Sequence, residues 1–325
     1  MANIKLGISL FSFTNPYATG EYDLEGCFRA AREIGVDGIE LVGTQMLDSY
    51  PYATEKTIGQ LAALCRHYAL EPVCYGANQD KGMLPGRDLS DDEMFQRALT
   101  DLKTAFLLGF KVVRFQWLLG IDNFVKLAPY AREYGLEIGI EIHNPETPST
   151  PLTTELIRRI DESGADNLGL VMDFGCFATK PNKPHWDDAL AAGAPLQLLE
   201  MARDLRYEGV PMPEAMQKLQ AAGAPPSVMA AASGMWGFVQ FSREPDFEGL
   251  ARVMPYIIHS HGKFHWVDET LTEASIPYDR VLKVYQDSDY DGYIVSECEG
   301  TMPDGSFNAT KRHIMMEKKI LGVAQ

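Results

Sequence analysis

Short hydrophobic segments rich in β-branched residues recur along the chain, and each is followed by a stretch whose apolar residues have helical spacing. We interpret these segments as strands. They cover residues 5–13, 38–43, 71–78, 111–116, 137–145, 168–175, 257–267 and 293–300. Strands that alternate with helices in this way predict a parallel sheet with helical crossovers.

The helices between these strands carry recognisable end signals. One is predicted over 23–35, with Gly35 as its C-terminal stop. Another is predicted over 89–109, where Ser90 is the N-cap and Glu93 completes a capping box.

Eight strand–helix units predict an α/β fold, a (β/α)8 TIM barrel that occupies residues 1–325 as a single domain. A doubly wound open sheet would have fewer strands and a glycine-rich phosphate loop, and no GxGxxG motif follows a strand in this sequence. Because active-site side chains of such barrels come from the carboxyl ends of the strands, we expect the catalytic residues of this chain there.

One connection is much longer than the others. More than eighty residues separate Asp173, at the end of the sixth strand, from His259 on the seventh. The segment 177–242 is rich in Ala, Met, Leu and Pro, which predicts a helical insertion of two or more helices over the barrel mouth or at a partner interface. A helical decoration with no role in the chemistry is the alternative.

Composition narrows the classes of partner. With 29 basic and 45 acidic residues the formal net charge is −16, which disfavours binding to nucleic acid or to anionic membranes. Five cysteines without a CxxC pair indicate neither a disulfide framework nor a zinc–thiolate site. No signal-like segment and no run of eighteen apolar residues occurs, so we expect a soluble cytoplasmic protein.

Polar side chains gather at the ends of four consecutive strands, where apolar residues would otherwise fill the barrel. Because side chains alternate along a strand, residues two apart face the same way. The fifth strand carries Glu141 and His143, the sixth ends in Asp173, the seventh carries His259, His261, Lys263 and His265, and the eighth carries Glu297 and Glu299.

Three of these carboxylates, Glu141, Asp173 and Glu297, would repel one another unless a cation lay among them. We therefore predict a divalent metal site, completed by one imidazole from either His261 or His265. Ligands rich in carboxylate favour Mn²⁺ or Mg²⁺, with Zn²⁺, Co²⁺ and Fe²⁺ as alternatives. Taken singly, a strand-end Asp can instead be a turn former and a Glu an ion-pair partner.

Three further residues are expected to lie near the predicted metal site. His259 lies deepest in the barrel and is expected to be a packed, hydrogen-bonded histidine. Lys263 could neutralise a substrate oxyanion or pair with a carboxylate. His143, two residues beyond a predicted ligand, would lie on the solvent side of the ion, where a general base is expected.

The order Glu, Asp, His, Glu on strands five to eight resembles the xylose isomerase-like TIM-barrel family of sugar phosphate isomerases and epimerases. The resemblance is carried by residues 35–41, 141–143, the apolar run into 173, 259–264 and 275–297. It implies Glu297 rather than Glu299 as the ligand, and His261 as the second histidine of an HxH pair. A register that matches KFHWVDE to the epimerase pattern would select His265 instead.

Three departures from the epimerases bring a second resemblance within that family. His143 follows Glu141 closely, the run HGKFHWVDE replaces the epimerase pattern, and a long insertion follows Asp173. Together with SIPYDR and SECEG, these features resemble the large (alpha) subunits of bacterial C-glycoside deglycosidases. Those lyases pair with a small β-sandwich subunit and cleave the carbon–carbon bond between a 3-oxo-sugar and an aromatic aglycone.

The resemblance implies a metal-assisted β-elimination within a hetero-oligomer. The metal would stabilise the enolate of the 3-oxo-sugar, and His143 or Glu141 would remove the proton from C2. His265 or Lys263 could hold the sugar. The flat aglycone would contact aromatic residues for which a place in the core is the alternative, namely Trp117, Phe177, Trp186 and Trp236.

Two other functions are compatible with the same residues. A sugar isomerase or 3-epimerase would use Glu141 and Glu297 to exchange a proton on a ketose through an enediolate. A non-catalytic metal-binding scaffold subunit would hold the ion for stability alone.

Overall fold

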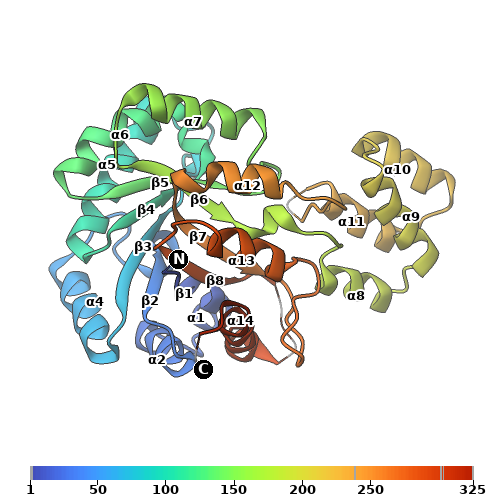
Figure 1. The fold of residues 1–325 in the computed structure, drawn as a ribbon, viewed down its shortest axis with the longest axis horizontal. Coiled ribbons are helices and arrows are strands. Elements are labelled where there is room, and N and C mark those ends of the chain that lie inside the picture. The colour runs from blue at the N-terminus through green and yellow to red at the C-terminus, as the bar shows by residue number, and fades with distance from the viewer. Residues whose placement is uncertain (1–2, 238, 301, 303, 324–325) are drawn as a thin grey trace.

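The computed structural model describes residues 3–237, 239–300, 302 and 304–323. Eight parallel strands close into a barrel in which each strand pairs with its neighbours in sequence and β1 pairs with β8 (Figure 1). The strands are Lys5–Ser9 (β1), Gly38–Val42 (β2), Glu71–Ala77 (β3), Val112–Phe115 (β4), Glu137–Ile142 (β5), Leu168–Asp173 (β6), Ile257–Phe264 (β7) and Tyr293–Cys298 (β8). The prediction of a (β/α)8 barrel is confirmed.

Helices surround this barrel and connect successive strands. They are Leu24–Ile34 (α2), Glu55–Tyr68 (α4), Asp91–Leu108 (α5), Ile121–Glu133 (α6), Pro151–Ser163 (α7), Phe247–Val253 (α12), Tyr278–Gln286 (α13) and Gly305–Leu321 (α14), with the short helices Thr14–Ala18 (α1) and Gly43–Met46 (α3). The predicted end signals are present. Ser90 and Glu93 form the capping box of α5, and Gly35 ends α2 with a φ of 88°.

Several strands are shorter than their apolar patterns. The run that begins with β1 continues as a 3-10 turn over Leu10–Phe13, and β6 continues as a 3-10 turn over Phe174–Phe177. Leu10, Phe13 and Phe174 are nevertheless fully buried. The apolar pattern extends past the last strand residue because the first turn of each loop also packs into the core.

The long connection between β6 and β7 contains four helices that lie within the predicted insertion 177–242: Lys183–Ala191 (α8), Leu196–Tyr207 (α9), Met212–Ala221 (α10) and Pro226–Met235 (α11). We call α8–α11 the helical lobe. It stands beside the barrel on the side toward which β6 leads (Figure 1). The lobe has a small core of its own, to which α9, α10 and α11 contribute Leu199, Leu219 and Val228.

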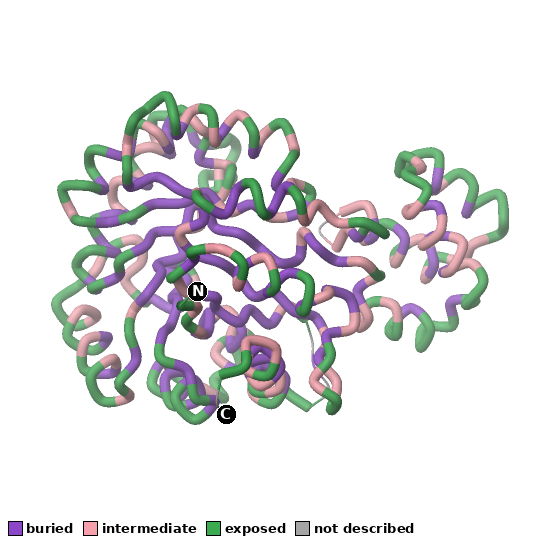
Figure 2. Tube along the Cα trace, in the orientation of Figure 1, coloured by how far each residue is buried: buried purple, intermediate pink, exposed green. Residues whose placement is uncertain are grey.

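Burial follows this architecture. The strands form a continuous buried layer, while the outer faces of the surrounding helices and of the helical lobe are exposed (Figure 2). Among the described residues, no helix combines the length and the hydropathy that crossing a lipid bilayer requires.

Candidate metal centre

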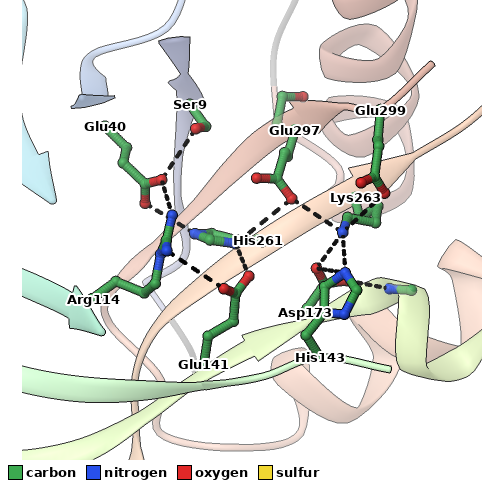
Figure 3. Close-up of polar contacts among 12 residues, drawn as sticks. Ser9, Glu40, Arg114, Glu141, His143, Asp173, His261, Lys263, Glu297 and Glu299 are labelled. Atoms are coloured by element: carbon green, nitrogen blue, oxygen red, sulfur yellow. Dashed lines mark hydrogen bonds and ion pairs between the residues drawn. The ribbon is translucent and has the colours of Figure 1, made fainter. Parts of the chain in front are cut away.

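The four predicted ligands come from four adjacent strands. Asp173 is the last residue of β6 and pairs with His261 on β7, while Glu141 lies on β5 and Glu297 on β8. Each offers a ligand atom, and these atoms all lie within 4.8 Å of one another (Figure 3). The structure therefore brings together the set predicted from sequence, with His261 rather than His265 as its imidazole.

His261 lies at the centre of this cluster and is fully buried. Its Nδ1 is 2.7 Å from Glu141 Oε1 and 3.6 Å from Glu297 Oε2, and its Nε2 is 3.0 Å from Glu40 Oε2. Burial alone would lower the pKa of His261, but the surrounding carboxylates outweigh burial and raise it well above the usual range. In the absence of a cation, the carboxylates thus favour a protonated imidazole among them.

One carboxylate oxygen in the cluster accepts no hydrogen bond. It is the buried Glu297 Oε2, which lies 3.5 Å from Lys263 Nζ, whereas Asp173 Oδ2 pairs with the same ammonium at 2.8 Å. Burial also raises the pKa of Glu297, because His261 and Lys263 only partly compensate the lost solvation. Three carboxylates and one imidazole at one point, with Glu297 Oε2 left without a hydrogen bond, fit a hard or borderline divalent cation.

Two charged residues beneath the cluster were not predicted from the sequence, Glu40 on β2 and Arg114 on β4. Both are buried, and the Arg114 guanidinium lies 4.0 Å from Glu40 Oε1 and 3.7 Å from Glu141 Oε2. Burial opposes ionisation of Glu40, but His261, His259 and Arg114 outweigh it and hold the pKa of this carboxyl well below its usual range. The available signal was a single charged residue inside each of two otherwise apolar strands.

Lys263 lies on the mouth side of the cluster. Its Nζ is 2.8 Å from Asp173 Oδ2, 3.0 Å from Glu299 Oε2 and 2.7 Å from His143 Nε2 (Figure 3). Burial would lower the pKa of Lys263, but the neighbouring carboxylates raise it well above the usual range. Of its two predicted roles, the structure therefore displays the carboxylate pairing.

The hydrogen bonds of His143 define its tautomer. Nδ1 is 2.8 Å from the Asn144 carbonyl oxygen, which can only accept, so Nδ1 carries the hydrogen. Nε2 is then the nitrogen with the lone pair, and it accepts from Lys263. This nitrogen is 3.8 Å from Asp173 Oδ2, and the side chain is 21% exposed. A proton acceptor thus lies beside the predicted ligands with partial access to solvent.

Two further histidines, His259 on β7 and His265 just after this strand, lie outside the group of predicted ligands. His259 is buried and its Nε2 is 3.1 Å from Glu40 Oε2, as expected for a packed, hydrogen-bonded residue. His265 Nδ1 is 3.1 Å from the Glu299 carbonyl oxygen, and burial lowers the pKa of His265, which favours the neutral form.

The aromatic candidates have different surroundings. Phe177 is fully buried and stacks on Phe247, and Trp236 donates its Nε1 hydrogen to the Val210 carbonyl oxygen within the lobe. Trp117 is 53% exposed. Trp186 instead lines a cavity between the lobe and the barrel.

Two cavities share Lys180 on their walls. The smaller, of about 10 Å³, lies beside the cluster and is also lined by His143, Lys263 and His265. The larger has a volume of about 650 Å³ and is lined mainly by residues of α8 and α9, among them Trp186.

Comparison with curated proteins identifies relatives along nearly the whole chain. The 3'-dehydrocarminate deglycosidase alpha subunit of Microbacterium sp is 32% identical over 313 residues, which cover 91% of this chain and 88% of the relative. The C-glycoside deglycosidase alpha subunit of Arthrobacter globiformis is 29% identical over 304 residues, which cover 92% and 86%. No protein-family profile matches the chain.

Solved structures share the fold at much lower identity. A sugar phosphate isomerase/epimerase from Parabacteroides distasonis has a TM-score of 0.59 at 11% identity, with 98% of this chain and 96% of the other covered. The 3-keto-D-glucoside 4-epimerase of E. coli has a TM-score of 0.55 at 12% identity, with 97% and 99% covered. These matches support the (β/α)8 barrel fold. The 32% identity to a deglycosidase subunit over most of both chains shows that this chain belongs to the family of C-glycoside deglycosidase alpha subunits.

Proposed function

We propose that this chain is the catalytic subunit of a divalent-metal-dependent lyase that cleaves the carbon–carbon bond between a 3-oxo-sugar and an aromatic aglycone. The observation that carries the proposal is the convergence of Glu141, Asp173, His261 and Glu297 next to the unprotonated Nε2 of His143. The deglycosidase names of the relatives support the reaction class.

The four side chains would hold the ion, with Mn²⁺ the first candidate. Once bound there, it would supply Lewis-acid stabilisation of the negative charge that develops on the 3-oxo oxygen. The protein would contribute the cation Lys263, which is 2.8 Å from Asp173 and could orient a polar sugar edge.

His143 is the proposed general base. Its Nε2 accepts from Lys263 in the protein without substrate. Once the Lys263 ammonium turns to the sugar, Nε2 would take the C2 proton, which is acidic because of the neighbouring carbonyl. The electron pair left at C2 then forms the C1–C2 double bond, and the pair of the C1–aglycone bond leaves with the aglycone carbon. That carbon takes up one proton, which protonated His143 can return, so the elimination balances without another reactant.

The larger cavity is the proposed aglycone site. Trp186 provides an apolar face. The wall also carries both basic and acidic side chains, namely Lys180, Lys183, Arg203, Arg243, Asp187, Glu200 and Asp204. A flat phenolic ring system, as in many aromatic glycosides, would suit an aromatic face bordered by hydrogen-bonding groups of both charges. Because the relatives are named alpha subunits, we also propose that a second, smaller subunit completes the active enzyme.

A sugar isomerase or 3-epimerase is the second candidate. Glu141 and Glu297 both border His261 Nδ1, at 2.7 and 3.6 Å, and could act on two faces of one substrate. Such a reaction would need neither an aglycone cavity nor His143 as base. A non-catalytic scaffold is disfavoured by membership of an enzyme family.

The test compares two substrates with the Mn²⁺-loaded protein, purified from its host together with any associated subunit. We expect release of aglycone from a 3-oxo-C-glucoside of a flavone, and no conversion of D-fructose, both measured by chromatography. The H143Q variant should lose about 100- to 10 000-fold in turnover while it still binds Mn²⁺.

The matched control is H67Q, because His67 is an exposed histidine on α4. Turnover of H67Q should equal that of the wild type. Epimer formation without aglycone release would overturn the lyase proposal, and a fully active H143Q variant would overturn the role of His143.

A further inference from the structure

A buried carboxylate lies directly beneath the predicted metal site and belongs to none of the four ligands. Glu40 has no solvent exposure, and its Oε1 accepts a hydrogen bond from Ser9 Oγ at 3.1 Å. Its Oε2 lies 3.0 Å from His261 Nε2 and 3.1 Å from His259 Nε2. Glu40 therefore joins strands β1, β2 and β7 under the cluster (Figure 3).

The chemistry of these contacts fixes the tautomer of His261. An ionised carboxylate only accepts hydrogen bonds, so the Nε2 atom that faces Glu40 must carry a hydrogen. The lone pair of a neutral imidazole must then lie on Nδ1. That atom faces Glu141 Oε1 at 2.7 Å and Glu297 Oε2 at 3.6 Å, on the side of the predicted ligands.

We propose that Glu40 is a positioning residue that holds the Nε2 hydrogen of His261 and so presents Nδ1 to a divalent metal ion. A carboxylate on the second nitrogen of a metal-binding histidine fixes the ring orientation and increases the basicity of the ligand nitrogen. The inference rests on the proposed metal site, but it concerns an interaction below that site rather than the reaction above it.

The same carboxylate could instead belong to a second metal site. Glu40, Cys74 and His259 also offer ligand atoms within 4.8 Å of one another. However, Glu40 already accepts from Ser9 and faces two imidazole N–H groups, and the Arg114 guanidinium lies 4.0 Å from its Oε1. A cation at this point would meet that positive charge and would have to displace the donors. These contacts favour a network of proton donors around Glu40.

Two substitutions separate the charge of Glu40 from its acceptor oxygen. E40Q keeps an oxygen that can accept one hydrogen bond but removes the negative charge. E40M removes both at similar volume. We expect the Mn²⁺ dissociation constant, measured by titration calorimetry on the protein with its associated subunit, to rise about tenfold in E40Q and about 100-fold in E40M.

Imidazole ¹⁵N spectra of the Mg²⁺-loaded protein, labelled on histidine, report the tautomer directly. The wild type should show His261 with hydrogen on Nε2 and metal on Nδ1, and E40M should lose this uniform state. If E40M does not fold, E40Q still tests the proposal. A purely structural Glu40 would lower stability but leave the dissociation constant and the His261 signals of E40Q unchanged.

The control variant is D101N, which also converts a buried carboxylate into an amide. Asp101 lies on α5 and contacts Gln79 and Tyr75 rather than a predicted ligand, so its Mn²⁺ affinity should equal that of the wild type. Wild-type protein that binds no divalent ion would overturn the proposed function. Wild-type and E40Q proteins that bind Mn²⁺ equally well would overturn only the inference about Glu40.

Discussion

Single residues set the charge balance at the barrel mouth. The carboxylates there outnumber the side chains that are always cationic, which are Arg114 and Lys263. The carboxylates are Glu40, Glu141, Asp173, Glu297 and Glu299. Protonated His261 supplies part of the missing positive charge. A divalent ion would replace that proton, so metal binding at this site should release protons.

The K263M variant tests this charge balance. Lys263 Nζ is 2.8 Å from Asp173 and 3.5 Å from Glu297, so it competes with a divalent ion for the same oxygens. Without the ammonium, the metal-free protein should lose about 3–5 kcal/mol of stability because buried carboxylates lose their partner. Mn²⁺ should then bind at least about tenfold more tightly and raise Tm by more than in the wild type.

Thermal unfolding with and without Mn²⁺ measures both effects. The control is K283M, because Lys283 on α13 is 64% exposed and its ion pair with Asp287 contributes little. Weaker metal binding in K263M than in K283M would mean that Lys263 supports the site rather than competing with the ion.

The predicted ligands could be found from sequence because strand geometry is regular. Alternation along β7 puts His261 and Lys263 on the same face, and the end of an apolar run marks Asp173. Glu40 and Arg114 lie within apolar strands, and alternation alone does not tell whether a charged residue faces the barrel interior. Their role depends on contacts between strands distant in sequence, such as that of Glu40 with His261.

At the scale of elements, the connection after β6 is what distinguishes this barrel. Where one helix would suffice as a crossover, the chain builds the four helices of the lobe and then α12 before it enters β7. The composition of 177–242 predicted helices over the barrel mouth or at a partner interface. It did not choose between these two places, because helix periodicity identifies an apolar face without its partner. The cavity lined by Trp186 depends on where the lobe lies.

The proposed aglycone site at this junction can be tested with W186A and R243Q. Arg243 lies over the Tyr207 ring at 4.1 Å, and Trp186 faces the same cavity. Loss of the contact of Trp186 or Arg243 with the aglycone should weaken substrate binding by about 1–2 kcal/mol. KM for an aromatic 3-oxo-C-glycoside should therefore rise roughly tenfold, while kcat stays within about twofold.

The control for this cavity is W117A, because Trp117 is an exposed tryptophan outside it. Its kinetic constants should match the wild type. If W186A lowers kcat and leaves KM unchanged, the aglycone binds elsewhere and the lobe acts on the chemistry by another route.

At the scale of the whole molecule, ionisable groups are buried beneath the outer helices as well as inside the barrel. Glu317 on α14 is fully buried, both of its carboxylate oxygens lack a hydrogen-bond partner, and burial raises its pKa well above the usual range. Asp101 on α5 is also buried, and burial raises its pKa to about 7 despite the opposing effects of Arg97 and Gln79. Stability of the fold should therefore depend on pH even away from the candidate site.

D101N tests this dependence on global stability. The pKa of Asp101 is about 7 in the folded protein and about 3.9 in an unfolded chain, so the folded state holds the proton more tightly between these values. Its contribution to the free energy of unfolding must fall as pH rises through that window, by roughly 4 kcal/mol in all and by roughly 2–3 kcal/mol between pH 5 and pH 8. D101N should remove this fall, which urea unfolding of the metal-free protein at pH 5, 6, 7 and 8 can measure as the difference from wild type.

T104V is the control, because the buried Thr104 hydroxyl on the same helix donates to the Pro51 carbonyl oxygen and carries no charge. The free energy of unfolding of T104V should change with pH as that of the wild type does. If the free energy of unfolding of D101N also follows the wild-type pH dependence, the raised pKa of Asp101 is contradicted.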